Sequence, residues 1–105
     1  MIEVDDLIAL VRAYNPRTDA ELIRAAYGYG AEMHAGQVRR SGEPYFTHPV
    51  QVACLLTEQR LDDATLVTAL LHDTIEDTRA SYLDIEARFG TEIAELVDGV
   101  TKLTN

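Results

Sequence analysis

Apolar residues recur at spacings of three and four along almost the whole chain, which is the period of an amphipathic helix. No stretch alternates apolar and polar residues for long enough to indicate a strand, and no internal repeat is present. The sequence therefore predicts an all-α fold. The expected helices run from 4 to about 15, from 18 to about 34, from 48 onward, from 63 to about 77, from 81 to 89, and from 91 onward.

The expected helix ends carry residues that favour such positions. Thr18 and Glu21 match the S/T-x-x-E capping box, and Ser81 is placed to cap the fifth helix. Pro49 suits the first turn of a helix, where its missing N–H has no helical partner to lose. Gly90 follows the fifth helix, and glycine is the residue that most often ends one. These signals support the helix boundaries given by the apolar period.

Gly28 and Gly30 fall inside the second expected helix. Glycine weakens a helix interior because it loses more backbone freedom on folding than any other residue. We expect close packing against a neighbouring element to explain them. The apolar face of this helix is predicted to contain Leu22, Ala25, Ala26 and Tyr29.

The length and charge of the chain limit its functions. A chain of 105 residues forms one small domain, and this one carries a net charge of −9 from 18 acidic and 9 basic residues. Such a charge argues against broad binding to nucleic acid or to an anionic membrane. A small anionic ligand remains compatible, provided that a metal ion or a local cluster of arginines offsets the repulsion.

Cysteine content and hydropathy bear on location. The single cysteine, Cys54, excludes an internal disulfide, fits a reducing cytoplasm and is expected to pack in the core. No apolar run approaches the roughly 18 residues that a membrane span needs. The N-terminal residues lack the basic start and cleavage site of a signal peptide. We therefore expect a cytoplasmic protein.

The segment LLHDTIEDT, residues 70–78, places four ionisable groups directly after an apolar run. If residues 63–77 form one helix, positions 66, 69, 70, 73 and 77 share a stripe that changes from apolar to acidic. His72, Asp73, Glu76 and Asp77 then form one polar patch. Three interpretations remain open: a solvated helix end, a pair between Asp73 and a buried arginine, and a metal site.

A metal site would need ligands from more than one segment. His72 and Asp73 differ by about 100° around a helix, so both side chains reach one ion. His48 is the better further candidate, since it stands where a loop meets a helix. The other histidine, His34, is expected to be a core or surface residue. Imidazole and carboxylate together suit Mn²⁺, Fe²⁺ or Zn²⁺.

The loop before His48 holds the only adjacent basic pair, Arg39 and Arg40, followed by Ser41. Arginine forms bidentate hydrogen bonds with phosphate and stacks on bases. A solvated turn with two incidental arginines is the alternative interpretation. The aromatic residues Tyr45 and Phe46 are expected to pack this loop against the protein rather than to bind a ligand.

Three blocks of residues together carry a family resemblance. They read H-x-G-Q-x-R-x-S-G-E-P-Y-x-x-H-P, L-L-H-D-x-x-E-D-T and F-G-x-E-I-A-x-L-V-D-G-V-T-K-L. In this order and spacing, they resemble the hydrolase domain of RelA/SpoT-type alarmone enzymes, within the HD phosphohydrolase superfamily. The resemblance runs from about residue 20 to the end and implies an HD-domain helical bundle. It also implies one bound Mn²⁺ and removal of the 3′-pyrophosphate from (p)ppGpp.

The resemblance assigns a role to each candidate residue. It implies that His48, His72 and Asp73 are metal ligands. It implies that Glu76 and Asp77 position and activate the attacking water. By the same resemblance, the nucleotide-binding residues are Arg39, Arg40 and Ser41.

The family's fourth metal ligand is an aspartate in a later helix, within a motif that these residues lack. We therefore expect residues 1–105 to be the N-terminal part of a single HD-type (p)ppGpp hydrolase domain. We expect low activity from this segment alone. We also expect it to be less stable than the full domain or to associate with itself. The alternatives are an HD phosphohydrolase for another nucleotide and a non-catalytic nucleotide-binding module. Whether a longer protein also synthesises (p)ppGpp is not encoded in these residues.

Overall fold

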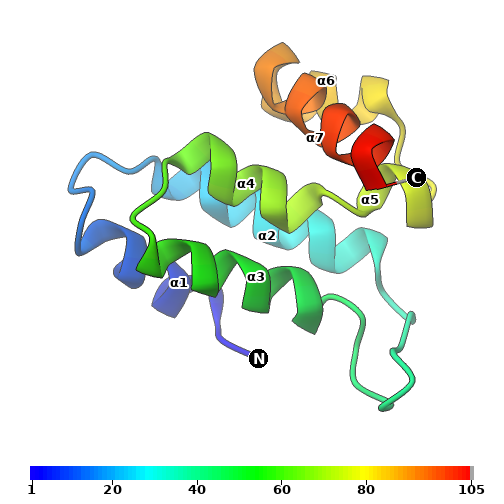
Figure 1. The fold of residues 1–105 in the computed structure, drawn as a ribbon, viewed down its shortest axis with the longest axis horizontal. Helices are drawn as coiled ribbons and strands as arrows, with labels where there is room; N and C mark the ends of the chain where they lie inside the picture. Colours follow the sequence, from blue (N-terminus) through cyan, green and yellow to red (C-terminus); the bar gives the residue numbers. More distant parts are fainter. Residues whose placement is uncertain (105) are drawn as a thin grey trace.

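A computed structural model describes residues 1–104 and contains helices throughout, with one isolated β-bridge between Val38 and Pro44 (Figure 1). The prediction of an all-α fold is confirmed. The helices are α1 (Val4–Arg12), α2 (Ala20–Met33), α3 (Thr47–Glu58), α4 (Asp63–Leu71), α5 (Thr74–Asp77), α6 (Tyr82–Phe89) and α7 (Thr91–Thr104).

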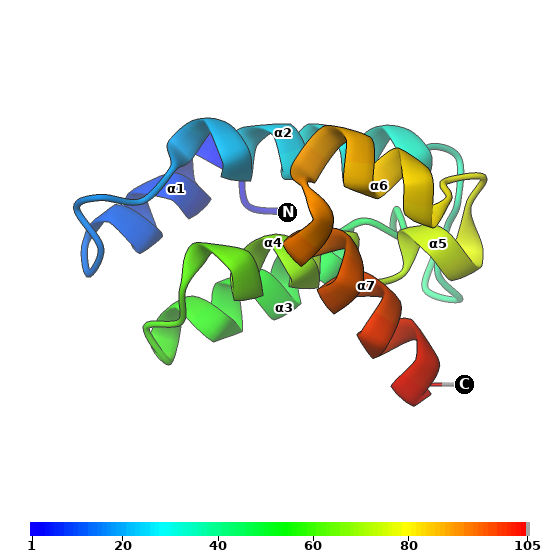
Figure 2. The same cartoon turned by 90° about the horizontal axis from the view of Figure 1, so that it is seen from above.

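Helix α4 is the centre of the fold. It packs on α2, α3 and α7, and residues Leu66–Leu71 are all buried. Helices α6 and α7 form a hairpin beside this centre (Figure 1). The loop between α2 and α3 and the short helix α5 lie at the same end of the molecule in both views (Figures 1 and 2). This end therefore brings together the two segments that carry the candidate residues.

The helix caps confirm one prediction and correct another. Ser81 and Asp84 form a complete capping box at the start of α6. At α2, however, the cap is Asp19, whose side chain accepts the backbone N–H of Leu22. The hydroxyl of Thr18 instead donates to Asp63 at 2.5 Å, which ties the α1–α2 loop to α4. The local pattern assigned the Thr18 hydroxyl to a helix cap, but this hydroxyl bonds to the distant Asp63 instead.

The two glycines of α2 have different surroundings. A Cβ atom at Gly30 would collide with the ring of Phe46 and would lie 3.0 Å from the carbonyl of Leu70. Around Gly28, a Cβ atom would meet nothing within 4 Å. Close packing therefore explains Gly30 but not Gly28. On the same helix Ala25 is exposed and Ile23 is fully buried, which shifts the predicted apolar face by one position.

The predicted helix from 63 to 77 is wrong as one continuous element. Helix α4 ends at Leu71, and α5 begins at Thr74 after a break at His72 and Asp73. The single stripe expected along this helix is therefore interrupted where its polar part begins.

No helix within residues 1–104 has both the length and the apolar character needed to cross a membrane.

Candidate functional site

The break between α4 and α5 is held by side-chain hydrogen bonds. Backbone carbonyls at the end of a helix lack helical donors and need other partners. The ring Nδ1 of His72 and the hydroxyl of Thr74 each donate to the carbonyl three residues earlier, at 2.7 Å. The hydroxyl of Thr101 on α7 donates to the carbonyl of Val97 at 2.9 Å and lies 3.4 Å from the carbonyl of His72. The break is thus a built feature that sets His72 and Asp73 at one corner.

His72 and Asp73 face each other at this corner, with His72 Nε2 at 3.2 Å from Asp73 Oδ2 and both side chains 19% exposed. Nδ1 of His72 faces a carbonyl, so in the neutral form of the ring Nδ1 carries the proton and Nε2 carries the lone pair. A lone pair and a carboxylate oxygen at this distance repel unless a cation or a proton offsets them. Two donors bound to one ion at right angles, about 2.1 Å away, are about 3 Å apart. The donor chemistry and spacing of this pair therefore fit a divalent metal ion.

His48 is the third predicted ligand and comes from another element. It lies in the first turn of α3, is half-buried, and its ring centroid is 6.5 Å from that of His72. The fold thus brings the three predicted ligands into one neighbourhood. Within residues 1–104, however, no three His, Cys, Asp or Glu side chains are spaced to hold a metal ion. The ligand types fit a divalent ion, but His48 is not spaced to share one ion with His72 and Asp73.

Tyr45 is the residue that the sequence interpretation missed. Its hydroxyl donates to Oδ2 of Asp73 at 2.6 Å and lies 3.5 Å from Oδ2 of Asp77. Burial, followed by the hydrogen bond to Asp73, raises the pKa of the Tyr45 phenol well above its usual value. The prediction that it packs the loop was incomplete. The sequence did contain a signal for this contact. A tyrosine expected to pack in a loop needs a hydrogen-bond partner for its hydroxyl once it is buried.

The predicted acidic pair, Glu76 and Asp77, lies on α5 with both residues exposed. Of the two, Asp77 is linked to the corner through the hydroxyl of Tyr45. Its backbone carbonyl also accepts a hydrogen bond from Gln37 Nε2 of the loop at 2.8 Å. A solvated helix end therefore describes Glu76 and Asp77. It does not describe Asp73, which is mostly buried and hydrogen-bonded.

The alternative of a buried arginine beside Asp73 is wrong. Every arginine of the described chain is exposed, and the hydrogen-bond and ion-pair partners of Asp73 are Tyr45 and His72. The negative charge at this corner is therefore not neutralised by a guanidinium group.

The predicted nucleotide-binding residues Arg39, Arg40 and Ser41 occupy the tip of the loop between α2 and α3. The loop turns back on itself, since the N–H of Arg39 donates to the carbonyl of Glu43 and Gly42 adopts φ 89°. All three residues are exposed. The loop is anchored beside α5, but the structure does not bring these side chains into contact with His72 or Asp73.

His34 is a core histidine, as one of the two expected alternatives had it. It is 2% exposed and stacks on Tyr45 and Phe46, with ring centroids 4.8 and 6.2 Å away. Its Nδ1 lies 2.9 Å from Oε1 of Gln37, whereas its Nε2 is buried without a hydrogen-bond partner among the described residues. This ring supports the loop and lies apart from the predicted ligands.

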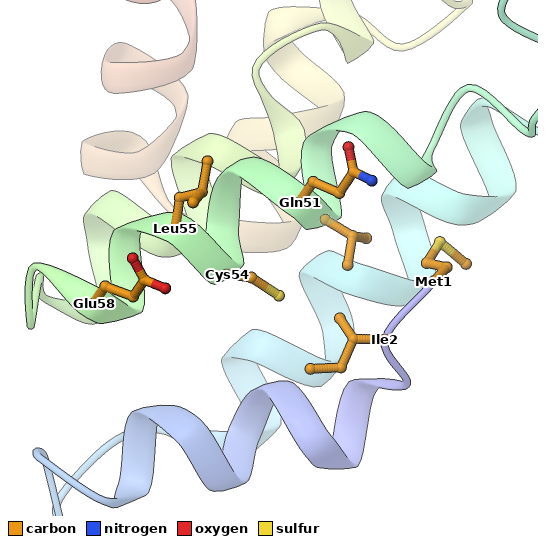
Figure 3. A pocket seen from close by; sticks show the side chains of 7 residues that line it. Met1, Ile2, Gln51, Cys54, Leu55 and Glu58 are labelled. Atoms are coloured by element: carbon orange, nitrogen blue, oxygen red, sulfur yellow. The ribbon is translucent and has the colours of Figure 1, made fainter. Parts of the chain in front are cut away.

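Two hollows in the surface differ in their relation to the candidate residues. The larger of the two, about 540 Å³, lies between the N-terminal segment and α3, where Cys54 and Ile2 point toward one another (Figure 3). It contains none of the candidate ligands, and burial there raises the pKa of the Cys54 thiol. A smaller hollow of about 250 Å³ includes His72 and is lined otherwise by Val52, Leu56, Thr65, Thr68, Ala69 and Val100. The smaller hollow therefore borders the candidate site.

Comparison with known proteins gives a consistent result. A family model described as "HD domain" matches residues 26–105. The chain is 54% identical over 94 residues to a GTP pyrophosphokinase of Myxococcus xanthus, covering 90% of this chain and 12% of the relative. It is 52% identical over 99 residues to the bifunctional (p)ppGpp synthase/hydrolase SpoT of Escherichia coli K12, covering 94% and 14%.

A third relative is the GTP pyrophosphokinase rsh of Brucella ovis, with 48% identity over 103 residues, covering 98% of this chain and 14% of the relative. The chain thus spans only 12–14% of the length of these relatives.

Proposed function

The chain belongs to the HD domain family, and from this premise we propose that it carries the metal-binding corner of a (p)ppGpp 3′-pyrophosphohydrolase. The reaction would use water and Mn²⁺ to convert (p)ppGpp into GDP or GTP and pyrophosphate in the cytoplasm. The carrying observation is the facing pair of His72 Nε2 and Asp73 Oδ2 at 3.2 Å. The names of the relatives, which include a bifunctional (p)ppGpp synthase/hydrolase, support this substrate.

In this proposal the metal is held by His48, His72 and Asp73. The Nδ1 of His72 is fixed by a backbone carbonyl, which is the arrangement that orients a histidine toward a metal. When bound, a divalent ion would offset negative charge on the pyrophosphate and lower the pKa of a water molecule. HD domains typically depend on divalent metals, and the preference for Mn²⁺ over other ions is part of the proposal.

The acidic residues of α5 would act on the attacking water. A carboxylate within hydrogen-bond reach of that water accepts its proton as the new bond to phosphorus forms. Asp77 is the better placed of the two, because the hydroxyl of Tyr45 joins it to Asp73. Glu76 would orient the same water from the preceding position of the helix.

The loop arginines would bind the nucleotide. The chain has a net charge of −9, so a tetra-anionic or more highly charged substrate needs local positive charge. Arg39 would pack near the guanine, and Arg40 and Ser41 would line the rest of the nucleotide site. Their exposure leaves them accessible to a ligand, and the loop that carries them is hydrogen-bonded to α5 through Gln37.

One observation favours a second function. The three predicted ligands are not closed around one point in residues 1–104. A chain with such a corner would bind the nucleotide without turning it over, as a sensing or interaction module. An HD phosphohydrolase for another nucleotide is a further alternative, which the paired arginines make less suitable.

The test is pyrophosphate release from ppGpp by the 105-residue chain, with Mn²⁺ and with a chelator. We expect release to require Mn²⁺ and to fall at least a hundredfold in Asp73→Asn. The control is Asp98→Asn on α7, which removes a partly exposed carboxylate that is paired with Lys102 outside the site. A panel of other nucleotides, assayed in parallel, tests the substrate.

Each outcome separates the alternatives. Release that a chelator does not reduce would exclude the metal mechanism. Binding of ppGpp without release would favour the non-catalytic module. Faster hydrolysis of another nucleotide than of ppGpp would change the proposed substrate without contradicting the proposed metal site.

A further inference from the structure

The loop between α2 and α3 is attached to the acidic corner at two points, by two different side chains. Gln37 Nε2 donates to the backbone carbonyl of Asp77 at 2.8 Å. Tyr45 donates its hydroxyl to Asp73 Oδ2 at 2.6 Å and approaches Asp77 Oδ2 at 3.5 Å. The two attachments come from the two ends of the loop and converge on one turn of helix. The loop therefore fixes the position of the corner.

The two attaching residues are themselves locked together. The N–H of Tyr45 donates to the carbonyl of Gln37 at 2.8 Å. The amide nitrogen of Gln37 is already a donor to Asp77, so its Oε1 must accept from Nδ1 of His34 at 2.9 Å. The ring of His34 then packs on that of Tyr45. The two attachments of the loop are therefore supported by one cluster of contacts, formed by His34, Gln37 and Tyr45.

Oxygen Oδ2 of Asp73 lies between two groups. On one side is His72 Nε2 at 3.2 Å, and on the other the hydroxyl of Tyr45 at 2.6 Å. The hydrogen bond from Tyr45 restrains this oxygen and with it the orientation of the Asp73 carboxylate. It also places a hydroxyl group between the carboxylates of Asp73 and Asp77, whose negative charges repel each other.

We propose that Tyr45 is a positioning residue: its hydroxyl holds the carboxylate of Asp73 in the orientation that faces His72. This inference rests on the proposed function only for the identity of the ligand that the corner receives. Tyr45 itself takes no part in the chemistry, and it acts through Asp73 and Asp77. The loop that carries Arg39 and Arg40 is thereby coupled to the metal ligands.

The test compares Tyr45→Phe with Tyr27→Phe in the 105-residue chain. Tyr27 donates its hydroxyl to the carbonyl of Ile2 at 2.8 Å, so the control also loses one tyrosine hydrogen bond to an acceptor, away from the site. We expect Tyr45→Phe to weaken Mn²⁺ binding 10- to 100-fold by titration calorimetry, the usual effect of removing a group that orients a metal ligand. The control should leave the Mn²⁺ affinity unchanged. Melting temperatures without metal should be similar in the two variants, because each loses one tyrosine hydrogen bond. A loss of Mn²⁺ affinity confined to Tyr45→Phe is then not what a merely structural role of Tyr45 would predict.

Amide hydrogen exchange without metal gives a second, independent reading. The N–H of Asp77 donates to the carbonyl of Asp73, so a loosened corner exposes it. We expect exchange at Asp77 and Thr78 to be several-fold faster in Tyr45→Phe than in Tyr27→Phe. Unchanged exchange together with unchanged Mn²⁺ affinity would overturn the positioning role.

The two proposals fail in different ways. If the unaltered chain binds no Mn²⁺, the metal assignment falls, and the exchange data alone then decide for or against Tyr45. If the unaltered chain binds Mn²⁺ and His72→Ala abolishes binding, while Tyr45→Phe changes neither the Mn²⁺ affinity nor the exchange, the metal site stands and the positioning role is refuted.

Discussion

The hydroxyl of Tyr45 lies 2.6 Å from Oδ2 of Asp73, although the two residues are 28 positions apart in the sequence. This hydrogen bond joins the arginine-bearing loop to the break between α4 and α5. The two segments that carry the candidate residues therefore form one unit rather than two neighbouring surfaces. Changes in the loop and changes at the break are expected to affect each other.

Mn²⁺ should stabilise the folded chain. A ligand that binds only the native state adds stability in proportion to the logarithm of its concentration, about 2.7 kcal/mol at 100 times its Kd. We expect Mn²⁺ to raise the melting temperature and a chelator to reverse the rise. In His72→Ala the rise should be absent. A rise of equal size in His72→Ala would show that the ion binds elsewhere.

The two glycines of α2 provide a matched pair for stability. Gly30→Ala should lower the free energy of unfolding by about 1–3 kcal/mol, because its Cβ atom would overlap the ring of Phe46. Gly28→Ala should raise it by about 0.5–1 kcal/mol, since the added methyl group meets nothing within 4 Å and alanine favours a helix. Urea unfolding measures both. Equal effects of the two substitutions would contradict the packing described for Gly30.

The cap of α4 should make stability depend on pH. The side chain and backbone of Thr65 donate hydrogen bonds to Asp62, which lowers the pKa of that carboxyl from its usual value. A carboxyl with a lowered folded-state pKa adds stability above its unfolded pKa, near 3.9, and loses it as the pH falls through the folded value. Asp62→Asn keeps a cap without the charge.

The measurement is urea unfolding of the unaltered chain and of Asp62→Asn between pH 2.5 and about 6. We expect the unaltered chain to be the more stable near pH 6, and the difference to shrink as the pH falls below about 4. Asp62→Ala, which removes the cap itself, should cost about 0.5–2 kcal/mol near neutral pH. A difference between the unaltered chain and Asp62→Asn that stays constant over the whole range would contradict the charge effect.

The loop arginines should contribute to nucleotide binding. Arg39→Ala and Arg40→Ala should each weaken ppGpp binding about tenfold or more, since a hydrogen bond to a charged group contributes about 1.5–3 kcal/mol. Arg24→Ala is the control, because Arg24 is paired with Asp5 on the surface. Titration calorimetry with Mn²⁺ present gives the affinities. Equal ppGpp affinity in all three variants would instead support the alternative interpretation, in which the loop is a solvated turn.

Much of the fold was determined by local signals in the sequence. The three- and four-residue apolar period predicted an all-α fold, and the Ser81 capping box and the Gly90 stop are present where expected. Such features can be read from neighbouring residues, because the apolar period of a helix and its capping pattern each span only one or two turns. The three motif blocks likewise identified the HD domain family from residue order alone.

The tertiary structure decided what local signals cannot specify. Thr18 donates to Asp63 instead of capping α2. The helix expected from 63 to 77 breaks where the side chains of His72 and Thr74 donate to its free carbonyls. Tyr45 meets Asp73 only because the loop folds back onto α5. A hydroxyl or an imidazole has several acceptors within reach of its own segment, and the packing of distant elements selects among them. The sequence therefore supplied the candidate residues, and the fold decided which of them hold one another in place.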